Sequence, residues 1–188
     1  MAVLIGLYSP CPGSGKSTAA AALAQEGWVV APFAAPLKAM AAALLEAAGY
    51  GQAEVEQLLA TGKQKELGLL AGAPTARHLL QTLGTAWGRE RIHPRLWIEL
   101  WEDRVQSLLA QGLAVVCDDL RTKEEMAAIR ALGGQVWVVE RPQGAINDRA
   151  TVAHATEGAL AAAQFDRVLL NDGTKAAFEA LVLGAIGP

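Results

Sequence analysis

The stretch AVLIGLYSPCPGSGKST, residues 2–18, decides the fold of this chain. Residues 2–8 are almost continuously apolar and rich in strand-forming residues, which predicts a strand buried on both faces, as in a parallel sheet. Residues 9–15 form a loop rich in Pro, Gly and Ser, and a helical pattern follows at about 16–25. A strand, a glycine-rich loop and a helix in this order form the context in which backbone N–H groups can hold phosphate.

Six consecutive residues carry the chemistry of this P-loop: Gly13, Ser14, Gly15, Lys16, Ser17 and Thr18. Glycine lets the backbone approach a polyphosphate closely, and the helix N-terminus adds the positive end of its dipole. Lys16 would reach the β- and γ-phosphates, and the Ser17 hydroxyl would ligate Mg²⁺. Pro10 replaces the first glycine of the pattern G-x-x-x-x-G-K-[ST], so the loop entrance must be built differently. The loop predicts nucleotide binding, with an ordinary Gly/Ser turn as the alternative.

Strand and helix patterns alternate along the rest of the chain. Strands are expected at about 28–31, 114–118, 135–140 and 167–170, and helices at about 75–90, 96–110, 122–132 and 174–183. A helical pattern also covers about 36–70, broken at Gly49, Gly51 and Gly62. This alternation predicts an α/β fold of the P-loop NTPase type, a three-layer sandwich with a mostly parallel sheet and helices on both faces. We expect a single domain over residues 1–188, with a helical substrate-binding insert at about 36–110 and a lid-like region at about 141–164.

Composition limits the class of protein further. The chain has 188 residues, of which 52% are hydrophobic and 19% are charged, so it can bury a core and is not intrinsically disordered. Its net charge of −3 argues against a nucleic-acid partner. No apolar run approaches the ~18–20 residues of a membrane span. The two cysteines offer neither a disulfide framework nor a zinc pattern, so we expect a reduced, cytoplasmic protein.

The apolar strand at 114–118 ends in two carboxylates, Asp118 and Asp119. Ligands of open α/β sheets bind at the carboxyl ends of the strands. One carboxylate is expected to serve Mg²⁺ or to accept a hydrogen bond from Ser17, and the sequence leaves open which one does so. The alternative is a turn acid that caps the next helix, a role that Thr122 already fills in the predicted capping box Thr122-x-x-Glu125. Arg121 would reach a phosphate or a transition-state oxygen, unless it is a solvated surface side chain.

The predicted helix at 75–90 carries a stripe of polar and small residues: Arg77, Gln81, Gly84 and Gly88. Such a stripe suits the wall of a binding cleft, and the alternative is close helix packing through the glycines with the polar side chains solvated. Arg89 opens a group of three arginines that would form a local phosphate site or a solvated basic rim. Lys38 opens a helix after the second strand, at the same edge of the sheet.

Together these motifs resemble the bacteriophage-type deoxynucleoside monophosphate kinases. The resemblance covers most of the chain and rests on an ordered set of segments, at residues 6–18, 33–38, 77–85, 87–89, 118–121, 140–142, 154–157 and 166–174. It implies a kinase that uses ATP and Mg²⁺ to convert deoxynucleoside monophosphates to diphosphates in the host cytoplasm. It also allows a homodimer.

The resemblance implies roles for single residues. The Lys16 loop would bind the ATP phosphates and Asn171 would lie near the ATP base, while Ser17 and Asp118 would bind the metal. Lys16, Arg121 and Arg141 would act in catalysis, Arg141 from a mobile arm. The substrate would be bound by Lys38, Arg77, Gln81, Trp87, Gly88, Arg89, Asp119 and Arg121. His154 and Glu157 match a short family motif whose role no physical argument assigns.

The expected reaction is in-line transfer of the γ-phosphoryl group of ATP to the 5′-phosphate of the deoxynucleotide. The acceptor oxygen is already anionic, so positioning and charge neutralisation suffice and no strong general base is needed. One rival is another small-molecule P-loop kinase, acting on dephospho-coenzyme A, a nucleoside or a sugar acid. The other is a P-loop ATPase or switch module, which would hydrolyse or retain ATP without any acceptor. The accepted bases, the preference between ribose and deoxyribose and the oligomeric state stay open.

Overall fold

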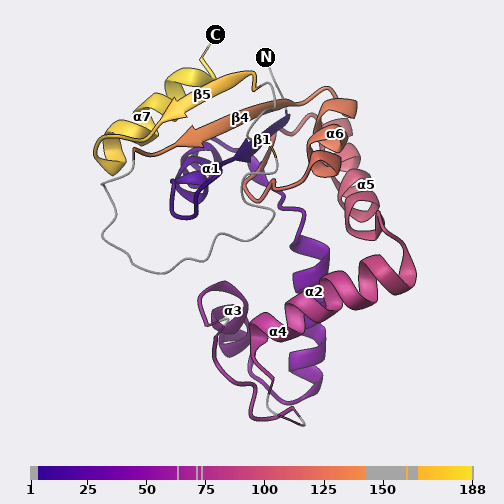
Figure 1. Ribbon diagram of the computed structural model, residues 1–188. Coiled ribbons are helices and arrows are strands. Elements are labelled where there is room, and N and C mark those ends of the chain that lie inside the picture. Colours follow the sequence, from indigo (N-terminus) through magenta and orange to yellow (C-terminus); the bar gives the residue numbers. More distant parts are fainter. Residues whose placement is uncertain are drawn as a thin grey trace. The chain divides into compact units, whose positions relative to one another are not determined.

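The structure, a computed structural model, describes residues 4–62, 64–70, 72, 74–142, 160 and 165–187 (Figure 1). It divides into two compact units, of which unit 1 comprises Met1–Phe33 and Glu102–Pro188, and unit 2 is Ala34–Trp101. The insert expected at about 36–110 overlaps unit 2. The lid-like region expected at about 141–164 lies outside the described residues, except at positions 141, 142 and 160.

Unit 1 is built on a five-stranded sheet in the order β2-β3-β1-β4-β5, in which all neighbouring strands are parallel. The strands are β1 Leu4–Tyr8, β2 Val29–Val30, β3 Val115–Cys117, β4 Gln135–Glu140 and β5 Arg167–Leu170. Every residue of the central strand β1 is buried, because helices cover a parallel sheet on both faces. The prediction of an α/β fold with a parallel sheet is confirmed.

Helices pack on both faces of this sheet (Figure 1). On one face, α1 Lys16–Gln25 and α7 Lys175–Ala185 contribute to a buried cluster that includes Ile5 and Leu7 of β1. On the other face, α6 Lys123–Ala131 comes so close to β1 that a Cβ on Gly6 would collide with the Ile129 side chain. The alternation of β1 side chains between the two faces produces the predicted sandwich of three layers.

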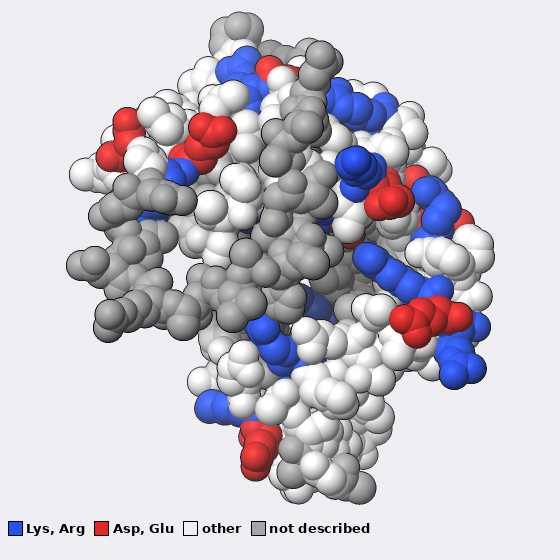
Figure 2. All heavy atoms as spheres, viewed as in Figure 1, with Lys and Arg blue, Asp and Glu red and all other residues white. Residues whose placement is uncertain are grey.

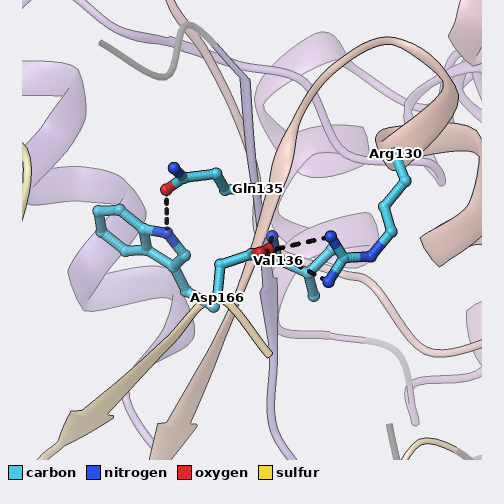
Figure 3. Close-up of polar contacts among 5 residues, drawn as sticks. Arg130, Gln135, Val136 and Asp166 are labelled. Atoms are coloured by element: carbon cyan, nitrogen blue, oxygen red, sulfur yellow. Dashed lines mark hydrogen bonds and ion pairs between the residues drawn. The ribbon is translucent and has the colours of Figure 1, made fainter. Parts of the chain in front are cut away.

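Asp166 fixes the start of β5 beside β4 (Figure 3). Its Oδ2 accepts the Val136 N–H at 2.7 Å, and its own N–H donates to the Val136 carbonyl at 2.9 Å. Arg130 of α6 forms an ion pair with the same carboxylate at 3.2 Å. Beside it, Trp137 Nε1 donates to Gln135 Oε1 at 2.8 Å. The two Asp166 contacts with Val136 hold the start of β5 beside β4. Because the two strands are parallel, the loops that follow them emerge at the same edge of the sheet.

Unit 2 is helical, with α2 Ala35–Ala47, α3 Gln52–Ala60, α4 Ala76–Gln81, the π-helix η1 Thr82–Ile92 and the first residues of α5 Leu96–Ala110. Its core includes Leu45 of α2 and Val55 of α3, both buried. The breaks predicted at Gly49 and Gly51 are confirmed, because α2 ends before them and α3 begins after them. The helical pattern predicted to continue from Gly62 to 70 is wrong, because α3 ends at Ala60 and no helix follows it before α4 among the described residues. Glu66 instead forms an antiparallel bridge with Thr75. The glycines that follow α3 disfavour a helix and permit this turn.

The helix predicted at 75–90 changes its geometry part-way. It is an α-helix up to Gln81 and a π-helix from Thr82 onward. Trp97 Nε1 donates to the Gly84 carbonyl at 2.8 Å, and its indole fills the space beside Gly88. The two glycines let the ring reach the helix backbone. The prediction was based on the spacing of side chains in an α-helix, which has 3.6 residues per turn. This spacing does not reveal that residues from Thr82 onward form a π-helix.

The surface mixes charges of both signs. On the face drawn in Figure 2, Lys and Arg side chains are interspersed with Asp and Glu, in keeping with the net charge of −3. Within the described ranges, no helix combines the length and the apolar character that crossing a bilayer requires. The described residues also contain no group of three or more His, Cys, Asp or Glu that could hold a metal ion.

Candidate active site

The loop between β1 and α1 has the backbone expected of a phosphate cradle. Gly13 (φ 71°) and Gly15 (φ 112°) both lie in the left-handed region that favours glycine, and Gly15 is the N-cap of α1. The Ser14 side chain is 1% exposed, and its Oγ has no hydrogen-bond partner in the part of the chain that the structure describes. A buried hydroxyl of this kind is stabilised when a polar ligand supplies the missing partner.

Ser9 builds the entrance of this loop. Its Oγ accepts the Cys11 N–H at 3.2 Å and donates to the Cys11 carbonyl at 3.0 Å. The side chain thereby closes a tight local turn around Pro10. This turn stands where the common pattern has a glycine, which explains how the loop tolerates a proline that fixes φ and lacks an N–H.

Ser17 and Asp118 meet at the carboxyl edge of the sheet. Strands β1 and β3 pair with Gly6 opposite Cys117, so the residues that follow the two strands emerge side by side. Ser17 Oγ donates to Asp118 Oδ2 at 3.0 Å. Of the two carboxylates that the sequence left open, Asp118 is therefore the one beside Ser17. A hydroxyl and a carboxylate are the oxygen ligands that Mg²⁺ takes in proteins, together with water and substrate phosphates.

Asp119 has different partners. Its Oδ1 accepts the backbone N–H of the buried Phe33 at 2.7 Å and the thiol of Cys117 at 3.3 Å. Burial raises the pKa of the Cys117 thiol, and the negative Asp119 carboxylate raises it further. Phe33 is the last residue of the N-terminal part of unit 1, directly before the chain enters unit 2. Asp119 thus fixes the backbone at the point where the chain leaves the sheet unit.

Glu125 holds the backbone around Arg121. Its Oε2 accepts the N–H groups of Arg121 at 2.8 Å and Thr122 at 3.1 Å, while Thr122 Oγ1 accepts the Glu125 N–H at 3.2 Å. The capping box predicted at Thr122-x-x-Glu125 is confirmed, whereas the contact of Glu125 with the Arg121 N–H was not predicted. The buried Glu125 therefore fixes the loop between Asp118 and α6, and the Arg121 side chain extends from it at the surface.

Two side chains at the ends of β4 and β5 contact the carbonyl groups of the P-loop. Asn171 Nδ2 donates to the Ser14 carbonyl at 2.7 Å, and Arg141 Nη1 lies 3.5 Å from the Gly13 carbonyl. Asn171 is only 8% exposed, and a Cβ on Gly15 would lie 2.5 Å from its Nδ2. The structure thus brings both residues against the loop that carries Lys16.

The remaining residues expected to bind substrate belong to unit 2. They lie on α2 (Lys38), α4 (Arg77, Gln81) and η1 (Trp87, Gly88, Arg89). The side chains from α4 and the Arg89 side chain are exposed, and Trp87 is 38% exposed with its ring centre 6.4 Å from that of Trp97. Gly88 is buried, and a Cβ there would lie 2.6 Å from the Trp97 indole. At Gly88 the structure therefore has the close glycine packing that was the alternative to the wall of a binding cleft. His154 and Glu157 lie outside the described residues.

Sequence comparison identifies the family. The family described as Deoxynucleotide monophosphate kinase matches residues 70–182. A protein of Acanthamoeba polyphaga mimivirus, provisionally named a deoxynucleotide monophosphate kinase, is 30% identical over 202 residues, covering 98% of this chain and 96% of that protein. The chain belongs to the deoxynucleotide monophosphate kinase family.

As a member of this family, the protein is a nucleotide kinase. It is therefore a phosphotransferase whose substrates are small nucleotides. Two solved structures share its fold. TT1252 from Thermus thermophilus aligns with a TM-score of 0.51 at 19% identity, covering 98% of each chain. The dephospho-CoA kinase from Campylobacter jejuni aligns with a TM-score of 0.52 at 14% identity, covering 97% of this chain and 95% of that one. The likeness confirms the fold predicted for a P-loop kinase.

Proposed function

We propose that this kinase transfers the γ-phosphoryl group of ATP to the 5′-phosphate of a deoxynucleoside monophosphate, giving ADP and a deoxynucleoside diphosphate. One observation carries the proposal: in a chain of this family, the P-loop at residues 13–18 presents Ser17 to Asp118 at 3.0 Å. A loop of this kind holds a nucleoside triphosphate, and the family name supports a deoxynucleoside monophosphate as the acceptor.

The P-loop binds the triphosphate. Its backbone N–H groups and the N-terminus of α1 carry partial positive charge at the position where phosphate oxygens would lie. Lys16 is the first residue of α1 and adds a full positive charge to this end of the helix. The positive charge of Lys16 neutralises negative charge on the γ-phosphoryl group while that group is transferred. This lowers the activation barrier, and no covalent intermediate is needed.

Ser17 and Asp118 fit a magnesium ion by the chemistry of their donor atoms. A hydroxyl oxygen and a carboxylate oxygen suit a hard cation that keeps several waters and binds substrate phosphates. These two residues would hold Mg²⁺ directly or through water. When bound, the ion neutralises negative charge on the β- and γ-phosphates.

The acceptor is bound by positively charged and polar side chains. Arg121, held by its backbone contact to Glu125, would contact a phosphate oxygen. Lys38, Arg77 and Arg89 would bind the 5′-phosphate, with the amide of Gln81 and the ring of Trp87 contacting the nucleoside. Arg141 would stabilise the charge on the transferred group. Because the attacking phosphate oxygen is already anionic, orientation of the two substrates supplies most of the catalysis.

An acceptor screen tests this function. The full chain is incubated with Mg·ATP and one acceptor at a time: each of the four common deoxynucleoside monophosphates, the matching ribonucleotides, dephospho-coenzyme A, a nucleoside or a sugar acid. We expect ADP to form with at least one deoxynucleoside monophosphate and to stay near background without an acceptor. Lys16→Ala should lower that rate by about a hundredfold or more while the fold is kept. ADP formation only with a non-nucleotide acceptor, or equally fast with none, would contradict the proposal.

A further inference from the structure

We propose that Asn171 is a positioning residue for the triphosphate: by holding the Ser14 carbonyl, it orients the backbone N–H groups of the P-loop toward the phosphates. The inference rests on the proposed function in one respect, namely that the loop at residues 13–18 binds a polyphosphate. It differs from the expectation drawn from the family resemblance, in which Asn171 lies near the ATP base.

The peptide geometry links the contact to the cradle. In a trans peptide the C=O of one residue and the N–H of the next point in opposite directions within one plane. Asn171 Nδ2 donates to the Ser14 carbonyl at 2.7 Å, so it fixes the direction of the Gly15 N–H. The 3.5 Å approach of Arg141 Nη1 to the Gly13 carbonyl restrains the neighbouring plane, which carries the Ser14 N–H. Both restraints act on carbonyl groups and leave the N–H groups for a ligand.

Asn171 is itself rigidly placed. Its backbone N–H donates to the Glu140 carbonyl at 2.8 Å, which continues the pairing of β5 with β4. Its side chain lies in the space that a Cβ on Gly15 would occupy, next to Phe178 of α7. A side chain that is 8% exposed has little surface left for a nucleotide base. The burial of Asn171 and its two hydrogen bonds are typical of a residue that holds a binding loop in place without contacting the ligand itself.

The positive φ of Gly15 explains why the loop needs such support. Glycine adopts the conformation at φ 112° without steric cost. Glycine also has many other accessible conformations, so Gly15 needs further contacts to stay in this one. The Asn171 amide closes the space behind this residue. It thereby limits the loop to the conformation that precedes α1, in which the N–H groups are oriented before the nucleotide arrives.

Inorganic tripolyphosphate distinguishes the positioning role from a base contact, because it has phosphates and no base. Its binding, and that of ATP, are measured with Mg²⁺ by isothermal titration calorimetry on wild type, Asn171→Ala and Asn171→Asp. We expect each variant to bind tripolyphosphate and ATP more weakly than wild type, with the same loss of affinity for both ligands, about tenfold or more. Asn171→Asp should lose more affinity than Asn171→Ala, because its carboxylate would face the Ser14 carbonyl oxygen. Unchanged tripolyphosphate binding with weakened ATP binding would overturn the proposal in favour of a base contact.

Thr174→Ala controls for general loss of stability. Thr174 lies three residues from Asn171, and its side chain caps α7 by accepting the Ala177 N–H at 3.2 Å. This variant should lower the melting temperature and leave tripolyphosphate affinity unchanged. The positioning role is wrong if Thr174→Ala and Asn171→Ala lower the melting temperature by similar amounts and also lower the affinity for tripolyphosphate by similar factors.

The binding measurements also separate this inference from the proposed function. A wild-type protein that binds tripolyphosphate but phosphorylates no deoxynucleotide contradicts the proposed acceptor. In that case the ratio of the variants' binding constants to that of wild type still decides the role of Asn171.

Discussion

The hydroxyl of Ser17 donates to the carboxylate of Asp118 at 3.0 Å, across 101 positions of sequence. The contact joins the helix after β1 to the end of β3, and it exists because these two strands are neighbours in the parallel sheet. It places an acid at the edge where the P-loop would hold the end of a triphosphate. The magnesium site proposed at Ser17 and Asp118 therefore depends on the pairing of β1 with β3.

Substitutions at this pair should reduce phosphoryl transfer and leave the fold intact, since Ser17 is exposed. We expect Ser17→Ala and Asp118→Asn each to lower the rate of ADP formation by about a hundredfold. Asp118→Asn keeps a side-chain oxygen that can accept the hydrogen bond from Ser17. A loss of activity in this variant would therefore be due to the missing negative charge. Ser17→Thr keeps the hydroxyl and should retain most activity. Near wild-type turnover in Asp118→Asn would show that the carboxylate charge is not used.

Asp119 should contribute to stability through the Phe33 backbone. Asp119→Ala leaves a buried N–H without its acceptor and should lower the free energy of unfolding by about 1–3 kcal/mol in a urea titration. Asp119→Asn keeps an acceptor oxygen and should lose less. Asp103→Ala, at an exposed acid on α5, is the matched control and should have little effect. Equal losses in Asp119→Ala and Asp103→Ala would mean that the Phe33 contact does not stabilise the fold.

The two thiols should differ in reactivity. Cys11 is exposed and Cys117 is buried with a raised pKa, so the native protein should react with a disulfide reagent at Cys11 alone. The second thiol should react only after unfolding in guanidinium chloride. A Cys11→Ser variant checks the assignment, because its native state should show no fast reaction. Fast modification of Cys117 in that variant would contradict the buried, protonated thiol.

The same raised pKa makes stability depend on pH. The folded protein keeps the Cys117 proton to higher pH than the unfolded chain, which releases it near the ordinary thiol pKa of about 8.5. Below that pH the stabilisation is fully present, and it is lost as the pH rises from there toward the raised folded pKa. Cys117→Ser does not titrate in this range and keeps a donor for Asp119. The free energy of unfolding should therefore fall more steeply above about pH 8.5 in wild type than in Cys117→Ser; equal slopes would contradict this.

Gly88 should not tolerate a side chain. A Cβ there would lie 2.6 Å from the Trp97 indole, so Gly88→Ala should destabilise the protein by about 1–3 kcal/mol in thermal or urea unfolding. Gly184→Ala on α7 is the matched control, because nothing lies within 4 Å of its Cβ position. Alanine favours a helix over glycine by up to about 1 kcal/mol, so this control should be neutral or stabilising. A neutral Gly88→Ala would mean that the indole is not packed against η1.

Local sequence patterns were sufficient for most elements of the sheet unit. The helix predicted at 16–25, the strands at 135–140 and 167–170 and the cap at Thr122 all agree with the structure, because each depends on neighbouring residues alone. The end of the helical stretch, at about 62–70, and the π-helix were not predicted correctly. In both, the decisive contacts come from elsewhere: the Thr75 bridge in one and the Trp97 indole in the other.

The sequence by itself determined the P-loop and the class of fold, because the apolar strand, the glycines, the lysine and the hydroxyl follow one another within residues 2–18 and act through short-range geometry. Tertiary structure decided which acid faces Ser17 and where Asn171 makes its contact. Asp118 and Asp119 are adjacent and chemically identical, and only the register of β3 beside β1 turns one toward Ser17 and the other toward Phe33. Asn171 meets Ser14 because β5 closes the same sheet edge, 157 positions along the chain.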